Sequence, residues 1–591
     1  MLDIAHGDAQ AIASAWLAGF ERCLSEQSTS GLNALFLDEC YWRDALALTW
    51  NLETLEGRAS IVARLNETAA RAGIGSLMLD ADAPAPKLVS RVGHDVIEAF
   101  FRFETQIGRG RGVVRIAATA GEDSQPRAWT VLTALEELKS FQEKTGSNRP
   151  TGQSHSRDFR GPNWLDQRQA AEAYDDHDPT VLVIGGGQAG LAAAARLTQL
   201  GVDTLIIDKH ARIGDNWRKR YHALTLHNQV QVNHLPYMPY PPTWPTYIPK
   251  DKLANWFEAY VEALELNYWT STELVEGSYD EYAKVWLVTL RRSDGTTRAM
   301  KPRHIVMATG VSGIPNVPEL PGLDSFSGQV VHSSAYEDGE DWSGKSAIVI
   351  GTGNSGHDIS QDLSSSGAHV TLVQRSPTLV VNIEPSAQLP YTLYAEGPAL
   401  EDCDLITVSM PTPLVRKAHV GYTEKSRELD QDLLNGLEKI GFKLDFGEDG
   451  TGWQFKYLTR GGGYYFNVGC SDMLVDGTIN LSQYDDIETF NEHGALMKDG
   501  TTKPADLIVL STGYKPQEVL VEKLFGAEVR ERIGPIWGFG EQLELRNMYC
   551  RTGQPGLWFI AGSLAQCRIN SKYLALQIKA CEEGIIPLTK D

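Results

Sequence analysis

The 591-residue sequence predicts an α/β fold in which two doubly wound units, each built on a parallel sheet, follow a smaller α+β unit. Two glycine-rich segments that come directly after apolar strands predict the doubly wound units. The strands span residues 181–184 and 347–350; the glycines are Gly185, Gly187 and Gly190 after the first, and Gly351, Gly353 and Gly356 after the second. A Gly-x-Gly-x-x-Gly turn brings backbone amides close to a pyrophosphate, and the following helix presents its positive end. We therefore expect two Rossmann-type nucleotide-binding domains.

Residues 1–140 carry the third observation, an α+β pattern. Apolar side chains recur at helical spacing from Ile12 to Leu24. Alternating apolar residues predict three strands, at residues 101–107, 114–116 and 129–135. We expect the run 108–112, Gly-Arg-Gly-Arg-Gly, to be the hairpin loop between the first two strands. The segment 41–57 resembles the NTF2-like (SnoaL-like) group of small domains, which implies a cone-shaped fold.

The first nucleotide site carries an acidic residue at the expected distance. A second apolar strand at residues 204–207 ends in Asp208, 23 residues after Gly185. A carboxylate about 20 residues after the glycine turn binds ribose hydroxyls. It suits FAD or NAD and repels the 2′-phosphate of NADP. Strand, turn, helix, strand and acid occur in order, which disfavours a glycine turn without a ligand.

The second site carries a cation at the corresponding place. Its second strand, residues 370–373, leads to Arg375, 24 residues after Gly351. A guanidinium favours a 2′-phosphate because it offers a fixed fork of donors. The two sites therefore divide into FAD at the first and NADPH at the second. A solvated surface role for Arg375 and the use of NADH are the open alternatives.

The segment between the two sites makes a family resemblance specific. Phe326-x-Gly328-x-x-x-His332-x-x-x-Tyr336 resembles the signature of class B flavoprotein monooxygenases. That class comprises flavin-containing monooxygenases, the plant YUCCA enzymes and Baeyer–Villiger monooxygenases. Three further segments resemble the family in the same order: Gly214-Asp215-Asn216-Trp217, Ala308-Thr309-Gly310 and Leu510-Ser511-Thr512-Gly513-Tyr514.

This resemblance covers residues 179–591 and implies a function. The chain is expected to use FAD and NADPH to insert one oxygen atom from O2 into a small organic substrate, through a flavin C4a-(hydro)peroxide. Trp217, Thr512 and Gly513 are then expected to line the cofactor sites. The implied domains are an NTF2-like domain at residues 1–140 and a linker at residues 141–178. An FAD-binding domain in two parts follows, at residues 179–343 and 476–591, with an NADPH-binding domain between them at residues 344–475.

The signature also narrows the reaction. Baeyer–Villiger enzymes usually have tryptophan at the position of Tyr336 and a reactive arginine soon after the one that binds NADP. Residues 376–384 contain no arginine. N- or S-oxygenation is therefore favoured, and a Baeyer–Villiger enzyme that converts ketones to esters or lactones is the alternative.

Four side chains are candidates for the reaction centre through the same resemblance. Asn228, in Leu226-His227-Asn228-Gln229, matches the asparagine of a T-N-x-P-K stretch that faces the flavin. The alternative for Asn228 is a loop residue that bonds to its own backbone. His332 and Tyr336 belong to the signature that joins the two domains. Arg568, on the expected C-terminal helix, is a candidate to stabilise negative charge on the flavin, and a surface role is the alternative.

Composition excludes several other classes. The net charge of −22 disfavours nucleic acid and anionic membranes as partners. The seven cysteines form no C-x-x-C pair, and no two lie within ten residues, which argues against a flavin disulfide reductase. The 14 histidines show no metal-binding spacing, so we expect no metal.

The remaining predictions concern location and assembly. The sequence shows neither a signal-peptide pattern nor an apolar stretch of about 20 residues, so we expect a cytoplasmic protein outside the membrane. A homodimer is one expected assembly. The N-terminal domain is expected to dimerise the chain or to cap the oxygenase pocket; a ligand held by Trp42, Asp44 and Trp50 is the alternative.

Overall fold

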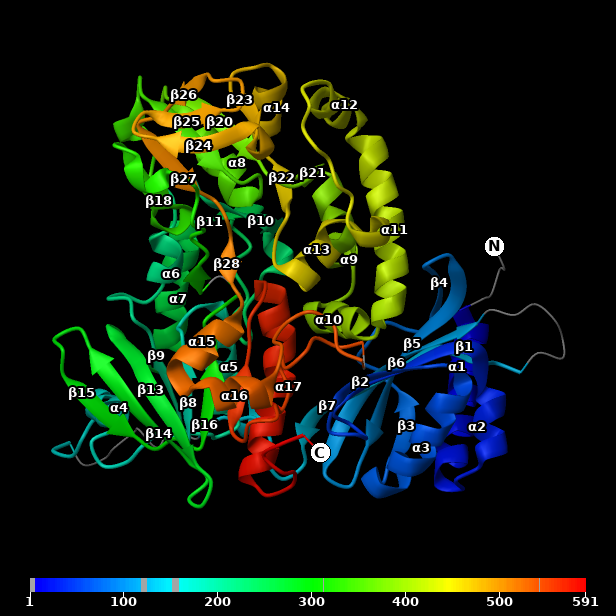
Figure 1. Ribbon diagram of the computed structural model, residues 1–591. Helices are drawn as coiled ribbons and strands as arrows, with labels where there is room; N and C mark the ends of the chain where they lie inside the picture. The colour runs from blue at the N-terminus through cyan, green and yellow to red at the C-terminus, as the bar shows by residue number, and fades with distance from the viewer. Residues whose placement is uncertain (1–5, 118–124, 151–158, 312, 542, 591) are drawn as a thin grey trace.

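The computed structural model describes residues 6–117, 125–150, 159–311, 313–541 and 543–590. Figure 1 shows an N-terminal unit at the lower right, a unit built on one parallel sheet at the lower left, and a unit built on a second parallel sheet at the top. The C-terminal helix α17 (Leu564–Glu582) stands between the N-terminal unit and the lower left unit.

In the N-terminal unit, three helices pack on a seven-stranded sheet. The helices are α1 (His6–Ser25), α2 (Thr29–Leu35) and α3 (Arg58–Ala72). The strands are β1 (Phe36–Ala45), β2 (Leu52–Glu56), β3 (Gly75–Leu79), β4 (Lys87–Arg91), β5 (His94–Glu104), β6 (Gly108–Ala117) and β7 (Ala128–Leu138). Their order is β2-β1-β7-β6-β5-β3, with β4 beside β5. Strands β1 and β7 are parallel, and the other pairs are antiparallel.

The prediction of a hairpin loop at residues 108–112 is wrong, because this glycine-rich run lies within β6. A Cβ atom on Gly110 would lie 2.1 Å from the ring of Phe103, and one on Gly112 would lie 2.2 Å from the ring of Phe101. The glycines therefore leave room for aromatic rings that lie across them from β5, a known device of curved sheets.

Asp44 of β1 is fully buried and bonded within its own unit. Its carboxylate accepts hydrogen bonds from the backbone amide and hydroxyl of Thr49 at 2.8 and 2.7 Å and from the hydroxyl of Thr133 at 2.6 Å. Burial raises the pKa of Asp44 to about 6. These hydrogen bonds explain the buried Asp44 carboxylate as a structural part of the N-terminal sheet.

The first parallel sheet has the order β12-β9-β8-β16-β29. Its strands are β8 (Val181–Ile184), β9 (Thr204–Ile207), β12 (Asn267–Trp269), β16 (His304–Met307) and β29 (Leu557–Phe559). Helix α5 (Gln188–Gln199) connects β8 to β9 and packs against α17. The end of the chain thus returns to the sheet that the first glycine turn belongs to.

The second parallel sheet has the order β18-β27-β19-β20-β23. Its strands are β18 (Gln329–His332), β19 (Ser346–Ile350), β20 (His369–Gln374), β23 (Asn480–Gln483) and β27 (Leu507–Leu510), and helix α8 (Asn354–Ser365) follows β19. The predicted range 344–475 is therefore too narrow for this unit. Strand β18 precedes that range and strands β23 and β27 follow it, because hydrogen bonding across the sheet brings together strands that are distant in sequence.

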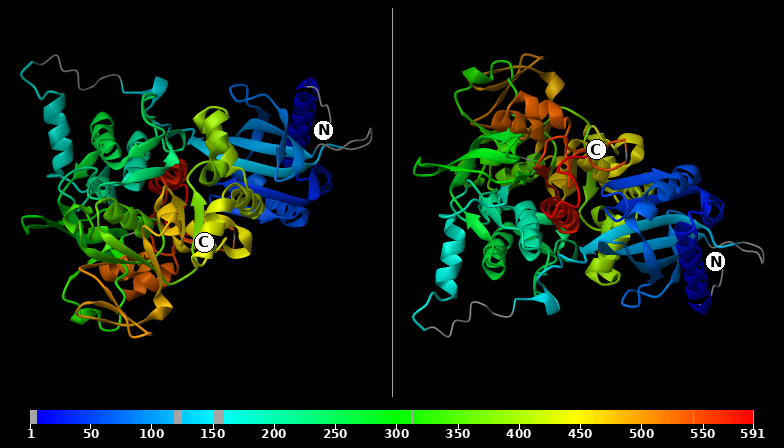
Figure 2. Two further views of the ribbon diagram at one scale, coloured as in Figure 1. Left: turned by 90° about the horizontal axis from the view of Figure 1, so that it is seen from above. Right: turned by 90° about the horizontal axis from the view of Figure 1, so that it is seen from below.

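A helical segment leaves the second unit between β21 (Leu379–Asn382) and β22 (Tyr464–Asn467). Its helices are α9 (Thr392–Glu396), α10 (Leu400–Val408), α11 (Thr412–Leu429), α12 (Gln431–Lys439) and α13 (Gly452–Arg460). Figure 2 shows that the N-terminal unit projects from one side of the molecule and meets the rest beside this segment and α17.

Charged side chains fasten the N-terminal unit to the rest. The Arg43 guanidinium donates to both carboxylate oxygens of Glu544 at 2.8 and 2.7 Å. Lys572 of α17 forms an ion pair of 2.6 Å with Glu136. In the part of the chain that the structure describes, no helix is long and apolar enough to cross a membrane, and no group of three or more His, Cys, Asp or Glu side chains is arranged to hold a metal ion.

Glu98 provides a test of a buried charge cluster in the N-terminal sheet. Its carboxylate accepts from Arg91 at 2.7 Å and from fully buried Arg115 at 2.9 Å. Burial acts to raise the pKa of Glu98, but the two arginines outweigh it and the pKa is lowered. Its stabilising effect is therefore present above the usual pKa of glutamate and is lost as the pH falls.

We predict that Glu98→Gln lowers the free energy of unfolding by about 3 kcal/mol, because two guanidinium groups lose a buried partner. Urea denaturation measures this loss. The control is Glu39→Gln, which removes an exposed ion pair with Lys417 and is expected to cost less than about 1 kcal/mol. Equal losses in the two variants would contradict the assignment.

Candidate functional site

The first glycine turn combines two glycines that the backbone requires with one that it does not. Gly185 has a φ of +104°, and a Cβ atom on Gly190 would lie 2.0 Å from the carbonyl oxygen of Gly185. A Cβ atom on Gly187 would approach only the side-chain amide of Asn216, at 2.9 Å. The first and third glycines therefore serve the turn and the packing of helix on strand, as the fingerprint predicts.

The second turn repeats this division more clearly. Gly351 has a φ of +114°, and a Cβ atom on Gly356 would lie 1.8 Å from the carbonyl oxygen of Gly351. A Cβ atom on Gly353 would meet nothing nearer than the carbonyl oxygen of Tyr464 at 3.8 Å. The fold does not need a glycine at position 353, so its missing side chain leaves open space above the start of α8. The fingerprint predicts a pyrophosphate at this position.

Helices α5 and α8 begin at these turns without side-chain caps. Their N-cap residues are Gly187 and Gly353, and neither provides a side-chain acceptor for the first amides. By contrast, Ser563 and Gln566 form a capping box at the start of α17. The free amides and the helix dipole at α5 and α8 therefore remain available for an anion.

The residues predicted to contact the ribose hydroxyls and the 2′-phosphate each follow the second strand of their unit. Asp208 follows β9, and its carboxylate accepts from the backbone amides of Gly186 and His210, each at 2.8 Å. These bonds hold the carboxylate at the mouth of the first turn. Arg375 follows β20 and is exposed, and its side chain forms no hydrogen bond or ion pair with any described residue. Its donors are free to bind a ligand.

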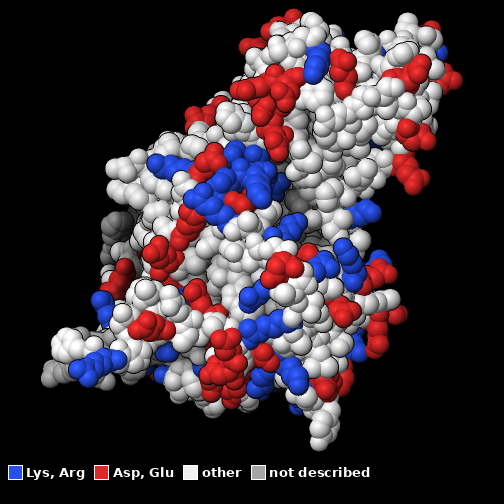
Figure 3. All heavy atoms as spheres, turned by 90° about the vertical axis from the view of Figure 1, so that its left-hand side faces the viewer, with Lys and Arg blue, Asp and Glu red and all other residues white. Residues whose placement is uncertain are grey.

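Basic side chains gather near the first turn, although the chain as a whole is acidic. Figure 3 shows a cluster of Lys and Arg on the face of the molecule that carries helix α6 (Asp215–Arg218). The segment 209–220 around α6 contains five basic residues: Lys209, Arg212, Arg218, Lys219 and Arg220. Three of them pair with Glu258 or Asp215. Such a cluster raises the local potential for phosphate groups.

Trp217 connects this region to the first glycine turn. Its indole N–H donates to the side-chain oxygen of Gln188 at 3.3 Å, and the side-chain amide of Gln188 donates to the carbonyl oxygen of Gly562 at 3.2 Å. Trp217 therefore supports the first residue of α5 and links it to the strand end that precedes α17.

The structure brings His332, Thr512 and Gly513 together where the chain crosses between the two parallel sheets. Strands β17 (Ile314–Pro315) and β28 (Tyr514–Lys515) pair at this crossing. The Nε2 atom of His332 donates to the carbonyl oxygen of Gly513 at 3.1 Å, and Nδ1 accepts from the amide of Ser334. Thr512 donates to the carbonyl oxygen of Asn316 at 2.6 Å.

Burial sets the protonation state of His332, and a hydrogen bond fixes the position of Tyr336. Burial lowers the pKa of His332, so the imidazole is neutral at neutral pH. The Tyr336 hydroxyl donates to Asp362 of α8 at 2.7 Å. The signature therefore fastens the crossing segment to the helix that begins at the second turn.

Asn228 lies on β10 (Thr225–Gln229), a strand held from the side of the second unit. The side-chain amide of Gln388 donates to the carbonyl oxygen of His227 at 3.0 Å, and that of Gln229 donates to Glu384 at 3.2 Å. The Asn228 side chain hydrogen bonds to the hydroxyl of Tyr391. Asn228 thus faces the junction of the two units.

Sequence reasoning missed the contact that β10 and the residues before it make with α8. The Tyr221 hydroxyl donates to Asp358 at 2.5 Å, and the His227 Nε2 atom lies 4.0 Å from the same carboxylate. Burial raises the pKa of Asp358 and lowers that of His227. The position of Asp358, two residues after Gly356, is the signal in the sequence that points to this helix face.

Arg568 is buried, and protein acceptors occupy four of its five N–H donors. Two bonds, of 2.8 and 2.7 Å, go to Asp404 of α10. The other two go to the carbonyl oxygens of Val232 and His234 at 2.7 and 2.8 Å. The structure therefore places this guanidinium between α10 and the segment that follows β10.

Comparison with known proteins agrees with this geometry. The family described as "Pyridine nucleotide-disulphide oxidoreductase" matches residues 182–394. The chain is 30% identical over 341 residues to a probable indole-3-pyruvate monooxygenase, YUCCA10 of Arabidopsis thaliana, which covers 57% of this chain and 82% of that protein. It is 31% identical over 356 residues to indole-3-pyruvate monooxygenase YUCCA1 of Oryza sativa subsp. japonica, which covers 59% of this chain and 80% of that protein.

Solved structures share the fold. An open crystal structure of cyclohexanone monooxygenase superposes with a TM-score of 0.52 at 18% identity and covers 69% of this chain and 88% of that one. The chain belongs to the flavin-containing monooxygenase family. It is a flavin-dependent monooxygenase that uses FAD, NADPH and O2.

The second turn yields a matched pair of variants. We predict that Gly353→Ala folds normally, because its Cβ atom meets no protein atom closer than 3.8 Å. Its KM for NADPH is expected to rise about tenfold, equal to about 1.4 kcal/mol of binding, because the methyl group fills the pyrophosphate space. Thermal unfolding and steady-state kinetics measure the two effects.

Gly356→Ala serves as the contrast. Its Cβ atom would lie 1.8 Å from the carbonyl oxygen of Gly351, so this variant is expected to lose stability by more than about 2 kcal/mol. An unchanged KM for NADPH in folded Gly353→Ala would show that the pyrophosphate does not bind over this turn.

Proposed function

We propose that the two glycine turns divide the cofactors, with FAD at Gly185, Gly187, Gly190 and Asp208 and NADPH at Gly351, Gly353, Gly356 and Arg375. The observation that carries this proposal is the pair of glycine turns that lead from a parallel strand into a helix, one held beside the carboxylate of Asp208 and the other in the unit that carries the exposed guanidinium of Arg375. Bound FAD supplies the chemistry that activates O2 with electrons from NADPH. Trp217, Thr512 and Gly513 support the cofactor sites through their backbone and side-chain contacts.

The roles of the chain's own residues follow from their contacts. We assign to the side-chain amide of Asn228 the role of a hydrogen-bond donor at the reaction centre that does not act as a strong acid. His332 and Tyr336 act by position, because their polar atoms bond to Gly513 and Asp362. They hold the crossing segment against α8, which keeps the two cofactor sites in register and excludes water between them.

For the substrate, we propose a small molecule that is oxygenated at nitrogen or sulfur. The exposed carboxylate of Glu384, which accepts from Gln229 next to Asn228, supports an amine because it attracts the protonated form, which then loses its proton to solvent and reacts through the free nitrogen lone pair. The second candidate is a Baeyer–Villiger type of reaction at a carbonyl group. The names of the plant relatives support this second candidate, because they give indole-3-pyruvate, a 2-oxo acid, as the substrate of those enzymes.

Two finer assignments concern the domains. We propose that residues 6–138 form an NTF2-like domain, since three helices pack on a curved mixed sheet. We propose a division in which β18, β19, β20, β23 and β27 belong to the NADPH-binding domain and the other parallel sheet, with α17, to the FAD-binding domain. A homodimer and a cytoplasmic location stay predictions from the sequence.

Isotopically labelled O2 tests the reaction. We expect FAD-loaded protein with NADPH to incorporate one labelled oxygen atom into an aryl sulfide or a tertiary amine, as measured by mass spectrometry. Labelled ester from a ketone, or label in the product of indole-3-pyruvate, would support the carbonyl reaction instead. NADPH oxidation that yields only hydrogen peroxide with all these substrates would contradict a monooxygenase.

Arg375 tests the choice of nicotinamide cofactor. We predict that Arg375→Ala raises the KM for NADPH about tenfold or more and leaves the KM for NADH nearly unchanged, because only NADPH carries the 2′-phosphate. Lys443→Ala, which removes a partly exposed cation paired with Asp485, is the control. Equal effects of Arg375→Ala on both cofactors would contradict the assignment.

A further inference from the structure

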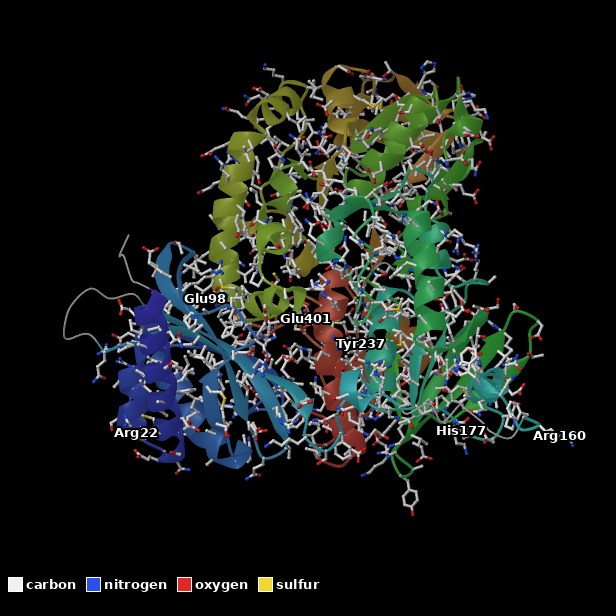
Figure 4. All side chains as sticks on the ribbon, turned by 180° about the vertical axis from the view of Figure 1, so that it is seen from behind. Arg22, Glu98, Arg160, His177, Tyr237 and Glu401 are labelled. Carbon is white, nitrogen blue, oxygen red and sulfur yellow. The ribbon has the colours of Figure 1, made fainter. Side chains whose placement is uncertain are left out.

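Three arginines of the N-terminal sheet hold helix α10. Arg43 donates to the carbonyl oxygen of Val408 at 2.6 Å, at the end of the helix. Arg111 forms an ion pair of 2.6 Å with Asp402 in its first turn. The third arginine, Arg115, donates to the hydroxyl of Ser409 at 2.8 Å. Figure 4 labels Glu98 on the sheet and Glu401 on α10 and shows the sheet beside this helix.

The same helix carries Asp404, which binds Arg568 of α17. The two-bond contact of 2.8 and 2.7 Å is the geometry in which a guanidinium and a carboxylate bind most strongly. The Arg568 side chain is only 4% exposed, and the Asp404 side chain is 17% exposed. Tyr394 also donates to Asp404, at 2.9 Å. A guanidinium buried to this extent requires its carboxylate partner, so the position of Arg568 depends on α10.

Arg568 in turn binds the segment that follows Asn228. One of its nitrogens donates to the carbonyl oxygens of Val232 and His234. Between them, the side-chain amide of Asn233 donates to the carbonyl oxygen of Asn228 at 2.9 Å. Val232 and Asn233 are buried, so these backbone groups have no water to replace a lost donor.

We propose that Asp404 and Arg568 are positioning residues that transmit the docking of the N-terminal unit on α10 to Asn228. The N-terminal unit is then part of the apparatus that shapes the reaction centre. This proposal rests on the proposed function only for the role of Asn228. Its physical content is that the contacts act in series, from the sheet arginines through α10 and the guanidinium to the carbonyl groups behind Asn228.

Hydrogen exchange of the full-length, FAD-loaded protein tests this coupling locally. In Asp404→Asn, the amides of residues 228–234 are expected to exchange about tenfold faster, which corresponds to about 1.4 kcal/mol of lost local stability. Asp402→Asn, which weakens only the docking of the sheet, is expected to speed exchange in the same segment about threefold. The matched control is Glu401→Gln, because Glu401 is exposed and its side chain bonds to no described residue.

Two further measurements separate a positioning role from general destabilisation. The fraction of NADPH electrons that leaves as hydrogen peroxide is expected to rise in Asp404→Asn and Arg568→Lys but not in Glu401→Gln. Because the contacts act in series, the effects of Asp402→Asn and Arg568→Lys on exchange are expected to be less than additive in the double variant. If Asp404→Asn does not fold, Arg568→Lys is required to show the same local acceleration.

Exchange in residues 228–234 that matches the Glu401→Gln control in both Asp404→Asn and Arg568→Lys would overturn the proposal. Fully additive effects in the double variant would also overturn it. Failure of the proposed function would give a different result. Labelled oxygen would then be missing from every product, while hydrogen exchange would still report the coupling between α10 and residues 228–234.

Discussion

Two helix starts that lack side-chain caps are the constraint on which the rest of this structure depends. A helix start leaves up to four backbone amides without partners inside the helix, and a capping side chain, water or a bound anion can satisfy them. Here α17 has a side-chain cap, formed by Ser563 and Gln566, whereas α5 and α8 begin at glycines. Each of the two open starts lies at the carboxyl end of a parallel strand, where α/β sheets place their ligands.

The distance between the two open sites is set by the crossings of the chain. The β17–β28 pair connects the two sheets, and His332 bonds to Gly513 beside it. Strand β10 and the segment after it are bonded to both units, through Gln388 on one side and Arg568 on the other. The N-terminal unit adds a third support through α10. The proposed reaction centre at Asn228 therefore depends on contacts from parts of the chain that are far apart in sequence.

The distance in sequence between contacting residues explains which features could be predicted from the sequence and which could not. The glycine turns, Asp208 and Arg375 follow local spacing, because the turn and the next strand fix where each of these residues lies. Local spacing gave a wrong prediction for residues 108–112. The glycines there leave room for the rings of Phe101 and Phe103 on a neighbouring strand, which local spacing does not reveal. It also said nothing of the partner of Arg568, because Asp404 is 164 residues away in the chain.

The central claim is that one chain holds two different dinucleotides at once, and the stoichiometry of binding tests it most directly. FAD can be counted by its visible absorbance after reconstitution, and NADP⁺ by calorimetric titration of the FAD-loaded protein. We expect one FAD per chain and one further NADP⁺ that binds without displacing it. A protein that stays colourless, or an NADP⁺ that binds only by displacing FAD, would contradict the account.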